Sequence, residues 1–389
     1  MNSMVTIKES KNISVDNNVI NFLNPDYIYI PIEEGFQINV KSNTLIYKED
    51  VLLKSEDKLI YSPISGKVLG KTSSMSDNNI SIPCVVVEND FREKIKKKKS
   101  TEKYINEYTC DDALNLIRKY NACNQRIDPH AKTLLINGID SDPFEKTFSH
   151  IIDSYSSKIL EAIDALSLIL GVDTTILAIN NHDTNNVINL SNNIGTYPNI
   201  TLKLVPDIYP LSYQDILIKT ILTKKQINSG IIYLTVQDIY NIYNVLKRKK
   251  PITEKLVTIS GNAIESPIVV NVKIGTSMAD LIKNCCHIIN KNYYVIVNGL
   301  ISGKTLTSLN NIITSETRSI FLNTVDSTPE KKCINCGLCN QKCPVGLNPK
   351  YIKEHKNADR SKCINCGLCS YICPSKINFK PFLGGKNGK

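Results

Sequence analysis

The sequence of 389 residues lacks any long uninterrupted apolar run. Its most apolar region, residues 159–172, is broken by Glu161 and Asp164 and falls short of the roughly 20 apolar residues that span a bilayer. No amino-terminal stretch joins a basic start to an apolar run and a small-residue cleavage site. We therefore expect a cytoplasmic protein that has no transmembrane segment of its own.

The surplus of positive charge is confined to one short segment. Lys and Arg outnumber Asp and Glu by 47 to 37, but residues 327–389 carry twelve basic and three acidic side chains, whereas the other 326 residues carry 35 and 34. The basic residues are not interleaved with aromatic ones, as a surface that stacks nucleic-acid bases requires. We therefore expect no nucleic-acid partner. The same segment holds eight of the 13 cysteines.

The patterns of strands, helices and turns divide the chain into four units, which together predict a multidomain α/β and α+β protein. Residues 25–92 alternate short apolar runs with turn signals and predict a small all-β domain. Residues 105–250 alternate apolar strands with amphipathic segments, which indicates an α/β domain with a largely parallel sheet. Residues 255–324 return to short strands around one helix, in a β-grasp-like order. Residues 327–389 hold few apolar residues, so this segment needs another source of stability.

The last unit contains two copies of a four-cysteine motif. Both copies read Cys-x2-Cys-x2-Cys-x3-Cys-Pro and contain the string CINCGLC, offset by 30 residues. Three cysteines at two-residue intervals let a tight loop hold three irons of a cubane, and the fourth ligates the other cluster of a two-cluster ferredoxin fold. Zinc bound by paired C-x2-C strings is the alternative. The spacing predicts one [4Fe–4S] cluster on Cys333, Cys336, Cys339 and Cys373, and a second on Cys363, Cys366, Cys369 and Cys343.

The local charge agrees with iron–sulfur chemistry. Each oxidised cubane with four thiolates carries about −2. Two clusters therefore offset part of the +9 that residues 327–389 carry. Gly337 and Gly367 suit the close approach of backbone amides to sulfide that such loops require.

The module order and several strings carry a family resemblance. The first unit contains PISGKV and VVVEND, the second KTLLINGIDSDPF, and the third VTISGNAIESPIVVNVKIGTSMADLI, before the two ferredoxin motifs. In this order the chain resembles RnfC, a component of the Rnf ion-translocating electron transport complex. The resemblance implies a barrel-sandwich hybrid, an α/β domain like the flavin- and NADH-binding domain of a peripheral component of complex I, a soluble-ligand-binding β-grasp domain and a two-cluster ferredoxin domain. It also implies that FMN and NADH bind near an acidic turn, which is matched here by Asn137, Asp140 and Asp142.

Two loops depart from the family pattern. The glycine-rich loop G-x-G-G-A-G-F-P is replaced by NACNQRIDPH, residues 121–130, which contains no glycine. Backbone amides cradle a phosphate only where the chain can approach closely, and the bulky Gln125, Arg126 and Ile127 work against this approach. The family loop Tyr-Pro-x-Gly-x-Glu becomes YPLSYQ, residues 209–214, without its glycine or its acid. The sequence therefore leaves undecided whether FMN and NADH bind, and whether the chain has an NADH dehydrogenase activity of its own.

The function expected from these features is electron transfer through two [4Fe–4S] clusters. The resemblance implies a peripheral protein on the cytoplasmic face of the plasma membrane, bound to the other components of a membrane-bound complex. Three alternative functions remain: a soluble carrier that serves another reductase, an NADH dehydrogenase that uses FMN, and a docking module whose clusters are largely structural.

Overall fold

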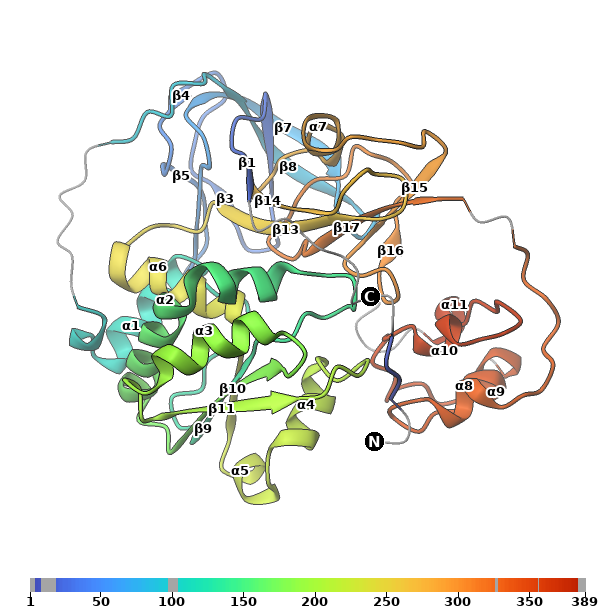
Figure 1. Ribbon diagram of the computed structural model, residues 1–389. Helices are drawn as coiled ribbons and strands as arrows, with labels where there is room; N and C mark the ends of the chain where they lie inside the picture. The colour runs from blue at the N-terminus through green and yellow to red at the C-terminus, as the bar shows by residue number, and fades with distance from the viewer. Residues whose placement is uncertain (1–3, 8–18, 97–103, 326–327, 356, 384–389) are drawn as a thin grey trace.

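The computed structural model describes residues 4–7, 19–96, 104–325, 328–355 and 357–383. These residues form two small antiparallel sheets, one parallel sheet, one six-stranded mixed sheet and a helical lobe. In Figure 1 the lobe, residues 328–355 and 357–383 (red), lies to one side of the sheets and beside the N-terminal segment. Among the helices of the described residues, none is both long and apolar enough to cross a membrane.

The first unit packs two antiparallel sheets around one apolar core that includes Ile28, Ile30 and Leu52. At the start of one strand only glycine fits, because a Cβ at Gly66 would lie 1.9 Å from the carbonyl oxygen of Glu88. The larger sheet has the order β2-β8-β7-β4, and its strands are Tyr27–Pro31, Ser81–Asn89, Gly66–Met75 and Leu45–Ile46. The smaller has the order β3-β5-β6, and its strands are Gln37–Ile38, Val51–Lys54 and Leu59–Tyr61.

The second unit is an α/β domain with a fully parallel sheet, as the alternation of strands and helices predicts. The strand order is β11-β10-β9-β12, so the chain winds outward in one direction from β9 and then continues on its other side. Such a switch point leaves a crevice at the carboxyl ends of the strands. The strands are β9 Thr133–Asn137, β10 Thr174–Asn180, β11 Ile200–Val205 and β12 Ile231–Thr235.

Helices cover both faces of this sheet. Successive side chains of a strand point to opposite faces. Leu134 and Ile136 accordingly pack into the core formed with α1, α2 and α6, whereas Leu135 packs into the core formed with α4. The long α2 helix ends at Gly171, which adopts the left-handed conformation common at helix ends. The helices are α1 Cys110–Lys119, α2 Thr147–Leu170, α3 Thr184–Ile194, α4 Gln214–Ile221, α5 Lys224–Asn228 and α6 Val236–Arg248, and a 3₁₀ turn covers Ile105–Glu107.

The third unit is a mixed sheet with the order β1-β14-β13-β17-β15-β16. Its edge strand β1 comes from the chain before the first unit and pairs parallel with β14. Helix α7 covers one face through Met278, Leu281 and Ile282. The elements are β1 Ile20–Phe22, β13 Glu254–Ser260, β14 Ile268–Lys273, α7 Met278–Cys285, β15 Tyr293–Val297, β16 Lys304–Thr305 and β17 Ser319–Thr324.

Buried charges join the first unit to the third. The Lys273 side chain is fully buried, and its ammonium lies 2.7 Å from Glu254 and 3.7 Å from Glu93. Lys48, from the first unit, pairs with the same two carboxylates. Breaking such a buried pair typically costs about 3–5 kcal/mol, because one charge is left without a partner. The network therefore holds these two units in one relative position.

The last unit has only a small apolar core, made by Ile352, Ile377, Phe379 and Leu383. Four of the motif cysteines pack against this core. The short helices α8 and α10 each follow a motif glycine in the left-handed conformation. The helices are α8 Leu338–Gln341, α9 Pro349–Glu354, α10 Leu368–Tyr371 and α11 Lys380–Leu383.

Candidate cluster ligands and a cavity at the sheet edge

The fold brings the motif cysteines together across the two copies. Burial raises the pKa of Cys339, and the neighbouring thiols that raise it further are Cys373 and Cys333. In the other group burial raises the pKa of Cys366 to about 12, and its thiol neighbours are Cys369, Cys343 and Cys363. In each group the fourth cysteine of one motif thus lies beside cysteines of the other motif.

One of these groups surrounds a cavity of about 220 Å³. Its wall contains all four predicted ligands of the second cluster, Cys343, Cys363, Cys366 and Cys369. The thiols surround this space and do not meet at one point. Within the described part of the chain, no three His, Cys, Asp or Glu side chains are arranged to hold a single metal ion. A four-thiol cavity of this kind fits a cubane, which needs one thiolate at each of four separated iron corners.

The second motif docks on the body of the protein. Cys366 and Leu368 belong to an apolar core shared with Phe144 of the α/β domain and with Ile301 and Phe321 of the third unit. The ammonium of Lys380, which lines the thiol cavity, donates a hydrogen bond of 2.8 Å to the carbonyl oxygen of Gly303. The first motif is far more open, and both Cys333 and Cys336 are exposed.

A second, larger cavity of about 410 Å³ lies at the carboxyl edge of the parallel sheet. Asn137 at the end of β9 and Thr235 at the end of β12 both line it, so it occupies the switch point of the sheet. Open α/β sheets bind ligands at this place. The opposite wall is contributed by the third unit, through Lys255, Glu316 and Arg318.

This sheet-edge cavity contains basic and unpaired polar groups. Lys255 is almost fully buried, and burial lowers its pKa to about 8. Its ammonium donates a hydrogen bond to the carbonyl oxygen of Ser315. Three buried polar atoms on the wall have no hydrogen-bond partner: Asn121 Oδ1, Gln237 Oε1 and Arg318 Nε. Such orphaned groups are uncommon in protein interiors, and here they mark a cavity prepared for a polar occupant.

Two tyrosines connect the two cavities. Tyr213 lines the sheet-edge cavity, and its hydroxyl lies 3.3 Å from that of Tyr209. The Tyr209 hydroxyl donates a hydrogen bond to the carbonyl oxygen of Cys366. Two side chains therefore connect the sheet edge to the backbone of the second motif at Cys366.

The structure sets one of the three residues predicted to bind FMN or NADH apart from the other two. Asn137 lines the sheet-edge cavity, where its amide donates a hydrogen bond of 3.2 Å to the carbonyl oxygen of Ser212. Asp140 lines a different cavity together with Asp142, and it accepts hydrogen bonds from the backbone of Phe148 and Ser149 in the first turn of α2. Burial raises the pKa of Asp140 to about 7.

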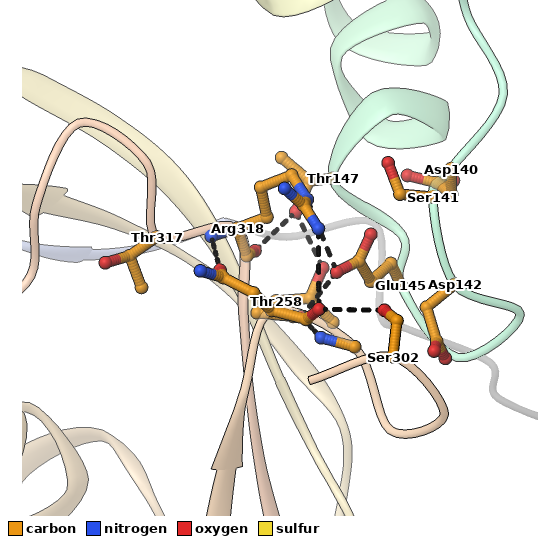
Figure 2. Close-up of polar contacts among 12 residues, drawn as sticks. Asp140, Ser141, Asp142, Glu145, Thr147, Thr258, Ser302, Thr317 and Arg318 are labelled. Carbon is orange, nitrogen blue, oxygen red and sulfur yellow. Dashed lines mark hydrogen bonds and ion pairs between the residues drawn. The ribbon is translucent and has the colours of Figure 1, made fainter. Parts of the chain in front are cut away.

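Asp142 instead links the α/β domain to the third unit. It accepts hydrogen bonds from the backbone N–H groups of Ile301, at 2.8 Å, and Phe144, at 3.3 Å. Figure 2 shows Asp142 near Ser302, whereas the Arg318 side chain points toward Glu145, whose carboxylate lies 3.7 Å from the guanidinium. Asp140 and Asp142 are therefore engaged in contacts that hold the backbone.

Asp142→Asn is expected to change how stability depends on pH. Burial raises the pKa of Asp142 to about 6 from 3.8, so the folded protein binds this proton more tightly than the unfolded chain does. Wild-type stability should therefore fall as pH rises from about 4 to about 6. Asparagine does not ionise, so the variant lacks this loss. The difference in the free energy of unfolding, variant minus wild type, should therefore rise by roughly 1 kcal/mol from pH 5 to pH 7. Denaturant unfolding at both pH values measures this change.

Asp57→Asn is the matched control for this prediction, because Asp57 is exposed. It should unfold in parallel with wild type over the same pH range. Parallel curves for Asp142→Asn as well would contradict the prediction.

The sheet-edge cavity does not reproduce a phosphate cradle built from backbone amides. Asn121, Cys123, Asn124 and Gln125 line it from the loop that stands where the family's glycine-rich loop is expected. The Asn124 amide donates a hydrogen bond to the carboxylate of Glu316 and so ties this loop to the third unit. The residues present thus do not fit the family mode of FMN phosphate binding.

Sequence reasoning missed Lys255 and Arg318, the cations of this cavity. Lys255 left a signal, because it occupies the same face of β13 as Val257 and Ile259, where a charged residue is unexpected. Arg318 has no such signal in the sequence, since it comes close to the α/β domain only through the docking of the third unit. The tyrosine contact with Cys366 likewise joins residues 157 positions apart.

Two family models match parts of the chain. The Nuo51 FMN-binding domain matches residues 113–246, and the 4Fe-4S dicluster domain matches residues 327–374. The α/β domain is thus of the complex I 51K type and the last unit is a ferredoxin-like 4Fe–4S domain, as the sequence predicts.

Three relatives with low sequence identity to this chain are C subunits of the ion-translocating oxidoreductase complex. That of Rhodobacter capsulatus is 22% identical, over 84% of this chain and 69% of the relative. That of Buchnera aphidicola is 25% identical, over 84% and 75%. That of Pectobacterium carotovorum is 27% identical, but over 58% of this chain and 32% of the relative. The predicted resemblance to RnfC is confirmed.

Among solved structures, a chain of the NAD+-reducing [NiFe]-hydrogenase in the air-oxidized state aligns with a TM-score of 0.49 and 12% identity, over 74% of this chain and 66% of that chain.

Proposed function

We propose that this chain transfers electrons, one at a time, through two [4Fe–4S] clusters as the RnfC component of an ion-translocating oxidoreductase complex. The observation that carries the proposal is the crossed grouping of the motif thiols, one group of which surrounds a single cavity. The similarity to the named relatives and to the 4Fe-4S dicluster domain supports the same function. The other subunits of that complex are then its partners.

The residues of the chain hold and tune the two sites. When bound, the clusters supply reversible one-electron chemistry. One cluster would be held by Cys333, Cys336, Cys339 and Cys373, and the other by Cys343, Cys363, Cys366 and Cys369. The burial of Cys366 shields that one ligand from water, and the Lys380 ammonium places a positive charge at the wall of the second site. A nearby cation stabilises the reduced, more negative state and therefore raises the reduction potential.

The remaining units provide the scaffold in this proposal. Residues 25–92 would form the barrel-sandwich hybrid, residues 105–250 the α/β domain, residues 255–324 the β-grasp domain and residues 327–389 the ferredoxin domain. The pairing of β1 with β14 adds an earlier segment to the β-grasp sheet. The chain would be a peripheral protein on the cytoplasmic face of the plasma membrane.

Metal and flavin analysis tests this function. Protein purified without oxygen should contain about eight irons and eight acid-labile sulfides, because two cubanes hold four of each. Two zinc ions and no sulfide would refute the proposal. The same preparation, once denatured, should release no fluorescent flavin, because the amide cradle is missing. Stoichiometric FMN together with NADH-dependent bleaching would instead favour the NADH dehydrogenase alternative.

A further inference from the structure

The two copies of the string CINCGLC adopt the same backbone conformation. Asn335 and Asn365 both have positive φ, at 58° and 54°. The following glycines, Gly337 and Gly367, have φ of 75° and 72° and begin equivalent short helices. The two loops therefore present the same surface, and any difference between them comes from what covers that surface.

The second copy is covered by the rest of the chain. Ile364 packs against apolar cores of the α/β domain and of the lobe interface. Leu368 is 1% exposed, and a Cβ at Gly367 would lie 2.2 Å from the carbonyl oxygen of Ile301. This copy shows what the shared surface is suited to do, since its isoleucine, glycine and leucine all pack against another part of the chain.

The first copy is bare. Every residue from 331 to 337 is exposed, and Ile334 is 65% exposed. A Cβ at Gly337 would meet nothing within 4 Å. Two cluster ligands, Cys333 and Cys336, lie in this stretch, so one edge of the first site faces solvent. Burying an exposed isoleucine contributes about 1.5–3 kcal/mol, so this surface offers binding energy that the chain itself does not use.

The charge around the bare copy selects the kind of partner. Lys331 and Lys332 come directly before Cys333 and are exposed, and neither has a carboxylate partner among the described residues. In sequence, residues 327–389 carry twelve basic and three acidic residues, and one of the acids, Glu330, is paired with Lys353. Even with two clusters of about −2 each, the segment stays positive. An acidic surface is its electrostatic complement.

We propose that residues 331–337 form the docking surface for an acidic, one-electron carrier protein, which exchanges electrons with the first cluster. This rests on the proposed function, because it assigns a partner to one of its two cluster sites. Contacts of this kind are small, short-lived and steered by charge, which suits one exposed apolar side chain in the same stretch as two exposed lysines. In the exchange the reduced carrier loses one electron and the oxidised cluster gains one. No bond is made or broken.

A pair of charge reversals tests the surface. Lys332→Glu and Lys362→Glu change residues at the same motif position, immediately before the first cysteine of each copy, and both lysines are exposed. The probe is a small acidic [2Fe–2S] ferredoxin, reduced in advance and mixed by stopped flow with the cluster-loaded full chain. Lys332→Glu should lower the second-order rate constant at low salt by roughly three- to tenfold and flatten its salt dependence, whereas Lys362→Glu should stay within about twofold of wild type.

Ile334→Ser tests the apolar part of the same surface. It should slow the reaction with ferredoxin at all salt concentrations, because it removes buried area and no charge. Equal rates for Lys332→Glu and Lys362→Glu would overturn the proposal. So would a dimer of the chain that Ile334→Ser dissociates, because a second copy would then occupy this face. Reduction of each variant by dithionite, followed in the same preparations, tests the proposed function separately.

Discussion

Cys343→Ser is expected to remove the cluster of the opposite motif and to leave that of its own motif intact. Cys343 belongs to the first copy in sequence, but its thiol lies beside Cys363, Cys366 and Cys369 and lines the same cavity. A serine hydroxyl is a poor substitute for the thiolate that each iron requires. The variant should therefore retain about four of the eight irons, because one cubane is lost.

Double variants separate the crossed arrangement from a sequential one. Cys343→Ser with Cys366→Ser should lose no more iron than either single variant, because both substitutions affect one cluster. Cys343→Ser with Cys339→Ser should lose nearly all the iron, because the two substitutions affect different clusters. Iron and sulfide analysis, together with the EPR signal of each reduced variant, measures both outcomes. The reverse pattern would show that each copy holds its own cluster.

Gly367→Ala is expected to weaken the docking of the lobe, whereas Gly337→Ala is not. Both glycines have left-handed φ, so alanine at either costs about 1 kcal/mol in backbone strain. A Cβ at Gly367 would also lie 2.2 Å from the Ile301 carbonyl oxygen, whereas at Gly337 the space is open. Because the obstacle is backbone and cannot turn aside, Gly367→Ala should cost roughly 1 to 3 kcal/mol more.

Hydrogen exchange at the contact loop measures this difference. The amide of Ile301 donates to Asp142 beneath the docked lobe. If the lobe is displaced, peptides that contain Ile301 should exchange faster in Gly367→Ala than in wild type. Gly337→Ala controls for the strain that the two substitutions share. Equal protection of Ile301 in both variants would mean that the second copy does not depend on this close approach.

Together these tests ask whether one repeated motif has two separate tasks. The second copy, held under Ile301 and Tyr209, faces the body of the protein, and the first faces solvent. An electron that enters at the exposed copy would then pass to the covered one, and from there the two tyrosines lead toward the sheet-edge cavity. The asymmetry gives the relay a direction in space although the two motifs are nearly identical in sequence.

The α/β domain was predictable because its signals are local. Buried strands such as Thr133–Asn137 read as short apolar runs, and α2 has a helical repeat that ends at a glycine. The candidate cluster ligands could be named for a similar reason, since the Cys-x2-Cys-x2-Cys spacing is set by the geometry of a cubane. The surroundings of the residues predicted to bind FMN or NADH were harder to predict. Asn137, Asp140 and Asp142 are close in sequence, but one faces the sheet-edge cavity and the others hold backbone N–H groups.

The sequence by itself determined where the positive charge lies, and it predicted four units and eight candidate ligands, because each depends on residues near one another along the chain. The tertiary structure alone decided which copy of CINCGLC is covered, since Ile334 and Ile364 sit in identical motif strings and differ only in what packs on them. It also decided that Lys255 and Arg318 share a cavity with Asn137. The reason is that contacts between distant segments decide which of two identical motifs is buried, and a local sequence pattern does not contain those contacts.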